Sequence, residues 1–242
     1  RSDTETQLNQ CENAIASGAD ALLFIPFDKD GAAPIIDNCN EAGIPVICCN
    51  NITTNVDQAT AYVGANDVEA GIMETEYIVD LIGGKGNIAV VEGPFGHSAQ
   101  VARQEGLEQV LAGYPDCKIV LDDTANWNRD EAMELVENWI AGGTQIDAII
   151  CHNDIMAMGA LQACQDAGLE IPIIGIDATY DALCAVKDGT LAADVYQDVY
   201  GQAEEAFNVC MRILNGETFE QTTYVPFKLI TKDNVDEYLA NF

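Results

Sequence analysis

Apolar and polar positions follow two alternating periods along almost the whole chain. Leu8, Cys11 and Ile15 recur at helical spacing, and the apolar run ADALLFIPF follows Gly18. We expect further helices near residues 31–42, 68–82, 98–112, 129–140, 154–167, 180–187, 198–214 and 232–240. The intervening apolar runs predict strands, namely IPVICCNN, TAYVGAN, NIAVVEG, KIVLDD, IDAIICHN, IPIIGID, LAADVYQ and YVPFKLI.

Strands this apolar, separated by helical segments, are typical of parallel sheets that are covered by helices on both faces. Glycines such as Gly168 and Gly216 follow the expected helices, where glycine adopts the left-handed conformation at little cost. The run GGKGN precedes a strand and lacks a Lys-Ser/Thr pair, so we interpret it as a helix end and not as a phosphate-binding loop. The pattern therefore predicts an α/β fold.

Polar side chains follow most of the expected strands. They are Asp28, Asn50 with Asn51, His97 with Ser98, Asn126 to Asn128, His152 to Asp154, Asp177 and Gln197. In open α/β sheets, ligands bind beyond the carboxyl ends of the strands. We therefore expect these residues to converge on one ligand site.

The residue types at these positions indicate the class of ligand. Amide, carboxylate and guanidinium groups make paired hydrogen bonds, and an indole offers a flat apolar face. The candidates with these groups are Asn50, Asn51, Arg103, Trp127, Asn153, Asp177 and Gln197. A sugar or cyclic polyol, with hydroxyls on its rim and C–H groups on its faces, matches this set. A phosphate would need glycine amides and more cations.

Charge narrows the choice of partners. The 242 residues include 40 acidic and 10 basic side chains, which gives a formal net charge of −30. Such a charge repels nucleic acid and anionic membrane surfaces, so we expect no nucleic-acid partner. The hydrophobic share of 48% is enough to fill the cores of two modest domains. No stretch is long and apolar enough to span a bilayer.

No motif for catalysis or metal binding is visible. The nine cysteines show no C-x-x-C spacing, so we expect small core residues and neither disulfides nor a zinc site. His97 and His152 lack metal-ligand spacing. G-x-S-x-G, Walker and G-x-G-x-x-G motifs are absent from the sequence. We expect a binding protein and not an enzyme, with no cofactor.

Four segments carry a resemblance to a known family. GHSAQVARQEG, NDIMAMGALQA, IPIIGIDAT and LAADVYQD resemble the periplasmic sugar-binding proteins of the ribose and galactose type, in the family's order and over nearly the whole chain. The resemblance implies a type I periplasmic-binding-protein fold: two doubly wound parallel-sheet lobes, joined by three crossover strands, that close on a sugar by a hinge. We expect one lobe to comprise residues 1–65 and 198–225, and the other 66–197 and 226–242.

The resemblance also implies partners and location. These proteins are the substrate-binding components of ABC importers, so we expect a membrane permease as partner and a monomer in solution. The location would be extracytoplasmic, either in the periplasm or lipid-anchored on the outer face of the cell membrane.

Residue roles follow by position. The resemblance assigns Arg103 to bidentate contacts with sugar hydroxyls, Trp127 to stacking, Asn153 and Asp177 to hydroxyls from the second lobe, and Gln197 to a contact at a crossover. Each role has a structural alternative: Arg103 could pair with Glu105 or Glu108, Trp127 could be core, and the others could be caps or turn residues. We expect Asp154 to be the N-cap of the following helix, which leaves Asn153 for the ligand.

The sequence departs from the family pattern in two places. Asn50 and Asn51 stand where ribose-binding relatives have an Asp-Arg pair, which argues against ribose itself. The chain also starts at what resembles the second helix of the first lobe, so a first βαβ unit is expected to be missing. Two other functions remain open: the effector-binding core of a LacI-type repressor, which shares the fold, and an α/β enzyme with unrecognised chemistry.

Overall fold

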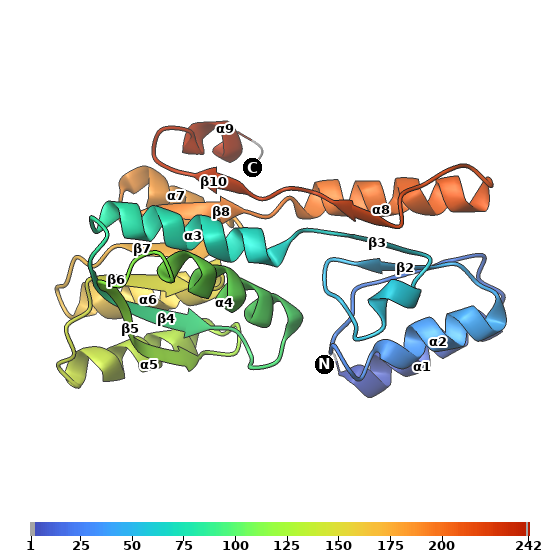
Figure 1. Ribbon diagram of the computed structural model, residues 1–242, viewed down its shortest axis with the longest axis horizontal. Coiled ribbons are helices and arrows are strands. Elements are labelled where there is room, and N and C mark those ends of the chain that lie inside the picture. Colours follow the sequence, from blue (N-terminus) through green and yellow to red (C-terminus); the bar gives the residue numbers. More distant parts are fainter. Residues whose placement is uncertain (1–2, 241) are drawn as a thin grey trace. The chain divides into compact units, whose positions relative to one another are not determined.

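The computed structural model describes residues 3–240 and 242. The chain divides into two compact units, Arg1–Asn66 with Asp198–Pro226, and Asp67–Gln197 with Phe227–Phe242 (Figure 1). It passes from one unit to the other after Asn66, after Gln197 and after Pro226.

The first unit is built on a parallel four-stranded sheet in the order β1-β2-β3-β9. Its strands are β1 (Leu22–Phe24), β2 (Val46–Cys49), β3 (Ala61–Gly64) and β9 (Thr222–Tyr224). Its helices are α1 (Thr4–Ala16), α2 (Ala33–Ala42), the short 3₁₀ helix η1 (Val56–Gln58) and α8 (Val199–Leu214).

Alternate residues of β2 belong to two different cores. Val46 and Cys48 pack in a cluster with Cys11 of α1 and Ile36 of α2. Ile47, between them, packs with residues of α8 on the other face. This period-two division is the reason that helices cover both faces of the sheet.

Strand β1 is shorter than the apolar run ADALLFIPF predicts. Only Leu22–Phe24 is extended, and its strand pairing is with β2. Within the described residues β1 is an edge of the sheet. Leu23 and Ile25 are accordingly 38% and 53% exposed, although their sequence pattern is typical of a buried strand.

The second unit contains a six-stranded sheet in the order β10-β8-β7-β6-β4-β5. Its strands are β4 (Gly86–Glu92), β5 (Cys117–Thr124), β6 (Ala148–Cys151), β7 (Ile173–Ile176), β8 (Ala193–Tyr196) and β10 (Lys228–Ile230). Its helices are α3 (Asp67–Leu81), α4 (Ser98–Leu111), α5 (Arg129–Ala141), α6 (Asp154–Asp166), α7 (Tyr180–Asp188) and α9 (Val235–Leu239).

One detail of the sheet prediction is wrong. The run YVPFKLI is not one strand: β9 and β10 lie on either side of Pro226 and belong to different sheets. Pro226 has no N–H group for a strand ladder, so strand pairing breaks there. Strand β10 also runs antiparallel to β8, whereas the other strand pairs are parallel.

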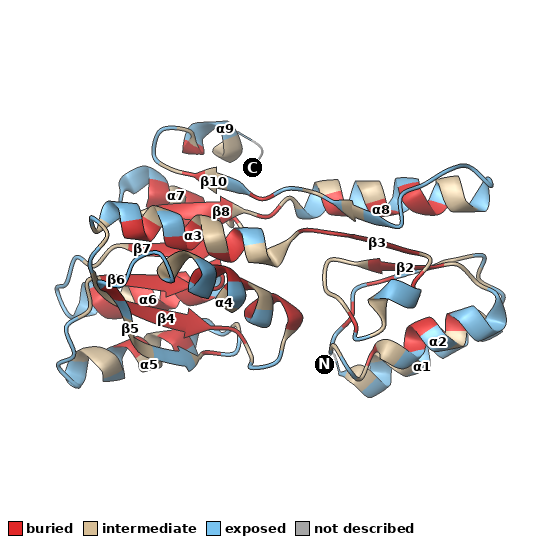
Figure 2. Cartoon of the chain, in the orientation of Figure 1, coloured by how far each residue is buried: buried red, intermediate tan, exposed pale blue. Residues whose placement is uncertain are grey.

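The core of the second unit lies in its central strands, which are buried throughout (Figure 2). Helices α3 and α4 pack very closely beside it. A Cβ atom at Gly71 would lie 2.0 Å from the carbonyl oxygen of Arg103, and one at Gly106 would lie 2.2 Å from that of Val68. Glycine is required at both positions, and this contact fixes the helix that carries Arg103.

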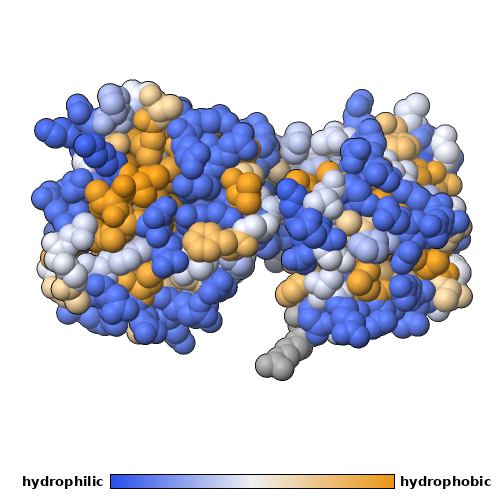
Figure 3. Space-filling model, turned by 60° about the horizontal axis from the view of Figure 1, so that its bottom comes forward, coloured by the Kyte–Doolittle hydropathy of each residue, from blue (hydrophilic) through white to orange (hydrophobic). Residues whose placement is uncertain are grey.

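The predicted α/β class with parallel sheets in two units is confirmed. On the face drawn in Figure 3, hydrophilic residues predominate, with small apolar patches between them. None of the described helices combines the length and the apolar character of a membrane span.

Candidate functional site

The second unit carries five of the seven candidate ligand residues. Arg103 lies on α4, which follows β4; Trp127, Asn153, Asp177 and Gln197 follow β5, β6, β7 and β8. Strands β4 to β8 are parallel and adjacent in one sheet, so their carboxyl ends lie at the same edge. Asn50 and Asn51 follow β2 in the first unit.

Arg103 is the best anchored of these side chains, at 4% exposure. Its Nε and Nη2 donate to Asp67 Oδ1 at 3.0 and 2.9 Å, and its Nη1 donates to the carbonyl oxygen of His152. Its guanidinium carbon lies 5.8 Å from the ring centroid of Trp127. The ion pair with Asp67 replaces the alternatives considered from sequence, Glu105 and Glu108.

The charge of Arg103 is secured by its neighbours. Burial alone would lower the pKa of the guanidinium, but Asp67, Asp177 and Glu74 outweigh it, and the net pKa is raised. A guanidinium has five N–H donors. Three of them make the contacts to Asp67 and His152, which leaves one N–H group on Nη1 and one on Nη2 outside these contacts.

Trp127 is half-buried and is held by specific neighbours. Its ring makes an edge-to-face contact with His97, with centroids 5.5 Å apart. Gly93 makes room for it, because a Cβ atom there would lie 2.1 Å from the indole. The indole is therefore fixed beside Arg103. It also packs against the core of the unit, so the alternative interpretation of Trp127 as a core residue is partly correct.

Asn153 has the cap position that was predicted for Asp154. Asn153 is the N-cap of α6: its backbone is extended, and its Oδ1 accepts a hydrogen bond from Met156 N at 3.0 Å. Asp154 is the first helical residue and is fully buried. The expectation that Asp154 caps the helix is thus wrong, because the cap position requires the non-helical conformation that Asn153 has. The Asn153 side-chain NH₂ group is the part of it that is not used by the cap.

Asp177 adopts a conformation that L-residues rarely adopt. Its φ angle is 130°, and the next residue, Ala178, has φ 59°. Burial raises the pKa of its carboxyl to about 7, although Arg103 lowers it. A half-buried carboxylate in a strained loop is a typical property of a functional site.

Backbone strain coincides with the candidate residues throughout the described chain. The non-glycine residues with positive φ are Asn50, Asn126, Trp127, Asp177 and Ala178. Each is a candidate ligand residue or the immediate neighbour of one. Such conformations cost about 1–3 kcal/mol each and are usually retained at binding or catalytic sites.

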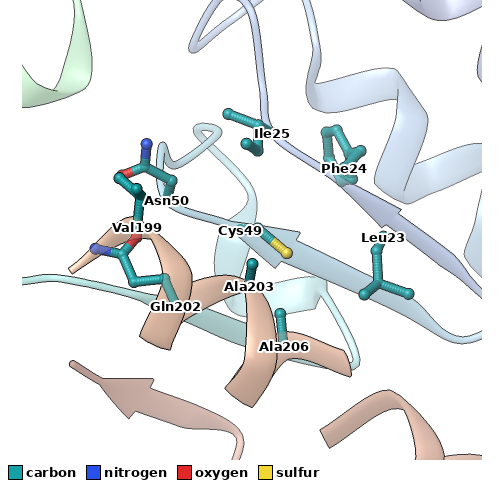
Figure 4. A pocket seen from close by; sticks show the side chains of 9 residues that line it. All are labelled: Leu23, Phe24, Ile25, Cys49, Asn50, Val199, Gln202, Ala203 and Ala206. Carbon is teal, nitrogen blue, oxygen red and sulfur yellow. The ribbon is translucent and has the colours of Figure 1, made fainter. Parts of the chain in front are cut away.

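In the first unit, part of the candidate pair is already engaged in the fold. Asn51 Nδ2 donates to Pro26 O at 3.0 Å, and the carbonyl oxygen of Asn50 accepts from the Tyr62 hydroxyl at 2.6 Å. The side chain of Asn50 lines a groove of about 290 Å³ together with Gln202, as Figure 4 shows. The remaining lining is apolar: Leu23, Phe24, Ile25, Cys49, Val199, Ala203 and Ala206.

The histidines and cysteines behave as structural residues. His97 Nδ1 accepts from Ala99 N at 3.2 Å and is the N-cap of α4. His152 is fully buried, and burial and Arg103 lower its pKa to about 3, so the ring is neutral. Burial raises the pKa of the neighbouring Cys151 thiol well above its usual value. Among residues 3–240 and 242, no cluster of three possible metal ligands is found.

Two functional residues were missed by the sequence reasoning. Asp67 holds Arg103, and Asp194 of β8 accepts from Ala178 N at 3.2 Å, next to Asp177. Asp67 follows the strand run TAYVGAN, so the strand-end rule would have identified it. Asp194 lies inside an apolar strand, where no sequence rule assigns it a role.

These features define a binding protein: buried, preformed hydrogen-bonding groups and an indole gather at one sheet edge of an α/β unit. The chain belongs to the family described as the periplasmic binding protein domain, whose model matches residues 1–218.

Several relatives agree with this membership. The chain is 39% identical to a xylitol-binding protein from Mycolicibacterium smegmatis over 97% of this chain and 67% of that protein. It is 40% identical, with a TM-score of 0.96, to an ABC transporter solute binding protein from Bacillus halodurans solved with myo-inositol; 99% of this chain and 84% of that one are covered. The Caulobacter myo-inositol binding protein, also solved with myo-inositol, matches at 29% identity and a TM-score of 0.93, over 99% and 84% of the two chains.

The family membership decides between the predicted functions. The relatives are binding proteins, so the prediction of a binding protein and not an enzyme is confirmed. The LacI-type repressor alternative is not favoured. Membership in this family also implies an extracytoplasmic location.

Proposed function

We propose that this protein binds a neutral polyol, of the inositol or monosaccharide size, and delivers it to an ABC import permease. The observation that carries the proposal is the pairing of Arg103 with Asp67, which leaves two guanidinium N–H groups beside the Trp127 ring and near Asp177. A ring of hydroxyls accepts from the guanidinium and donates to the carboxylate.

Charge explains why the ligand is neutral. The positive charge of Arg103 is already matched by Asp67, and Asp177 and Glu74 add further carboxyl groups near it. An anionic ligand would meet an excess of carboxylates in a low-dielectric site. Hydroxyl groups, in contrast, satisfy amides, carboxylates and guanidinium without adding charge.

The bound ligands of similar proteins support a cyclic polyol in particular. Two structural relatives are described with bound myo-inositol, and the Mycolicibacterium relative is described as binding xylitol. Ribose is less suitable, because Asn50 and Asn51 replace the Asp-Arg pair of ribose-binding relatives and Asn51 is engaged with Pro26. We therefore rank inositols first, xylitol second and pentoses third.

Calorimetric titration of the full-length, ligand-free protein tests this proposal. We expect myo-inositol or xylitol to bind with a Kd of about 1 μM or below, and inositol phosphate to bind far more weakly. Absence of binding by every inositol, pentitol and monosaccharide in the panel would overturn the proposal.

The permease partner and the attachment to the membrane belong to the same proposal. An ABC permease recognises the ligand-bound form, so ligand should increase co-purification of the protein with its permease in detergent. We infer a monomer that is either free outside the cytoplasm or lipid-anchored to the outer face of the membrane. Incorporation of labelled fatty acid by the exported protein would distinguish these two forms.

A further inference from the structure

The loop Asp177–Thr179 needs an external restraint to keep its shape. Asp177 and Ala178 both have positive φ, at 130° and 59°, and neither is glycine. A strained loop persists only where the surrounding structure fixes it. The restraint must therefore come from groups that bind the backbone of this loop.

Two buried carboxyl groups supply that restraint from two elements. Asp154 Oδ2, at the start of α6, accepts a hydrogen bond from Thr179 N at 2.6 Å. Asp194 Oδ1, on β8, accepts one from Ala178 N at 3.2 Å. Both side chains are fully buried. Together they bind the two consecutive amide groups that follow Asp177.

The second oxygen of each carboxyl has no hydrogen-bond donor within the described part of the chain. Asp154 Oδ1 and Asp194 Oδ2 are buried and have no partner among the nitrogen and hydroxyl groups of the described residues. Each acid nevertheless acts on the pKa of the other, so the two carboxyl groups are close neighbours. Gly175, which pairs with Asp194 across the sheet, allows this approach: a Cβ atom there would lie 2.4 Å from Asp154 Oδ1.

Such a contact requires a proton between the two acids. Two ionised carboxylates at hydrogen-bond distance would repel each other strongly in a buried site, and a carboxylate pair has no donor of its own. Burial and Asp194 raise the pKa of Asp154 well above its usual value, and burial raises the pKa of Asp194 to about 6. The pair titrates as a unit.

We propose that Asp154 and Asp194 share one proton and act together as the positioning pair that fixes Asp177 for the ligand. The inference rests on the proposed function, because it requires Asp177 to contact the polyol. One acid donates to the other, and each keeps one oxygen for the loop backbone, so a single proton satisfies the whole arrangement.

The charged surroundings keep this proton in place near neutral pH. Asp177 acts on Asp154 in the direction that raises its pKa. Glu74 of α3 faces Asp194 and is itself fully buried, and burial raises its pKa. Arg103 is the cation of this region, and it is paired with Asp67.

Asparagine substitutions test the shared proton, because an amide reproduces a protonated acid with one acceptor and one donor. In Asp154→Asn, the amide oxygen accepts from Thr179 N and the NH₂ group donates to Asp194; Asp194→Asn is the mirror case. We expect each single variant to bind myo-inositol within about threefold of the wild type. In the double variant two donors face each other, and we expect binding to weaken roughly 10-fold or more.

The pH dependence of affinity adds a measurement that a purely structural role of Asp154 and Asp194 would leave unchanged. At alkaline pH the wild type loses the shared proton and its affinity falls, whereas each single asparagine variant keeps its donor and should show a smaller fall. Asp188→Asn, on an exposed part of α7, is the matched control and should follow the wild type. Thermal unfolding identifies any variant that does not fold.

The outcomes separate this inference from the proposed function. If the wild type binds no polyol, the proposed function fails. If the wild type binds and the double variant binds equally well, or both single variants lose binding while folded, the shared proton is refuted. Should the double variant not fold, the pH profiles of the two single variants still decide: profiles identical to that of the wild type would refute the inference.

Discussion

The strand ends of the two units use their polar groups in different ways. In the second unit, Asp67 binds the Arg103 side chain, and the buried Asp154 and Asp194 bind the backbone amides that follow Asp177. In the first unit, Asn51 is bonded to Pro26, and Asn50 lines a mostly apolar groove. We therefore expect substitutions in the second unit to change the affinity for hydroxyl groups more than substitutions in the first unit.

The largest expected effect comes from Arg103. Arg103→Lys keeps the positive charge but loses the planar fork, so we expect polyol affinity to fall by about 100-fold or more. Arg212→Lys is the matched control in the first unit, since Arg212 forms a half-exposed ion pair with Glu205. Titration calorimetry measures both variants. Equal effects of the two substitutions would contradict the contrast between the units.

Substitution of Asp177 should affect affinity less than substitution of Arg103 and should also change the pH dependence of stability. Asp177→Asn removes a charged acceptor, and we expect binding to weaken about 10-fold. The folded-state pKa of Asp177 is raised to about 7 from 3.8, so the stability linked to its protonated form is present below pH 3.8 and is lost as the pH rises through 7.

The asparagine variant cannot ionise and should therefore unfold at a higher temperature than the wild type at pH 8. The difference should shrink as the pH is lowered towards 4. Thermal unfolding across this range, without ligand, is the measurement. A variant less stable than the wild type at pH 8 would show that ionised Asp177 is a net stabilising group.

Gly93 allows a test of Trp127 without changing the indole. In Gly93→Ala the new Cβ would lie 2.1 Å from the ring, so the indole must move and polyol affinity should fall about 3- to 10-fold. Gly113→Ala is the control, because its Cβ would meet Val110 O at 3.4 Å. Tryptophan fluorescence should shift in the first variant and not in the second. An unchanged affinity despite a shifted spectrum would remove Trp127 from the site.

The smallest effect is expected in the first unit. Asn51→Ala removes the hydrogen bond to Pro26 and should lower the free energy of unfolding by about 1 kcal/mol. Affinity should change less than about threefold, because the side chain is already engaged. A loss of affinity as large as that of Asp177→Asn would show that both units bind the ligand with equal strength.

Periodicity was sufficient for most of the architecture. The expected helix 129–140 corresponds to α5, Arg129–Ala141, and 154–167 to α6, Asp154–Asp166. The failures occur where tertiary context decides. The apolar run before residue 28 predicts β1, but it does not predict that β1, within the described residues, pairs with β2 alone. The run YVPFKLI does not reveal that the residues before and after Pro226 belong to two different sheets.

The candidate site was predictable only in part. The rule that ligands lie beyond strand ends selected Asp177 and Asn153, and the structure places both after strands of the same sheet. Asn153, and not Asp154, is the cap of α6, since one residue of register decides which side chain takes that position. The contact of Asp67 with Arg103 and that of Asp194 with Ala178 N could not be predicted, because each depends on the packing of elements that are distant in the sequence.

The free cysteines determine how the protein withstands an oxidising compartment. All nine are free thiols; seven are buried, and Cys49 and Cys184 are half-buried. Burial raises the pKa of Cys49 to about 11 and that of Cys48 to about 12, so neither is a reactive thiolate at neutral pH. In an oxidising compartment the native fold is therefore the protection against sulfenic acid and mixed disulfides. The rate of thiol alkylation then reports how often the protein opens.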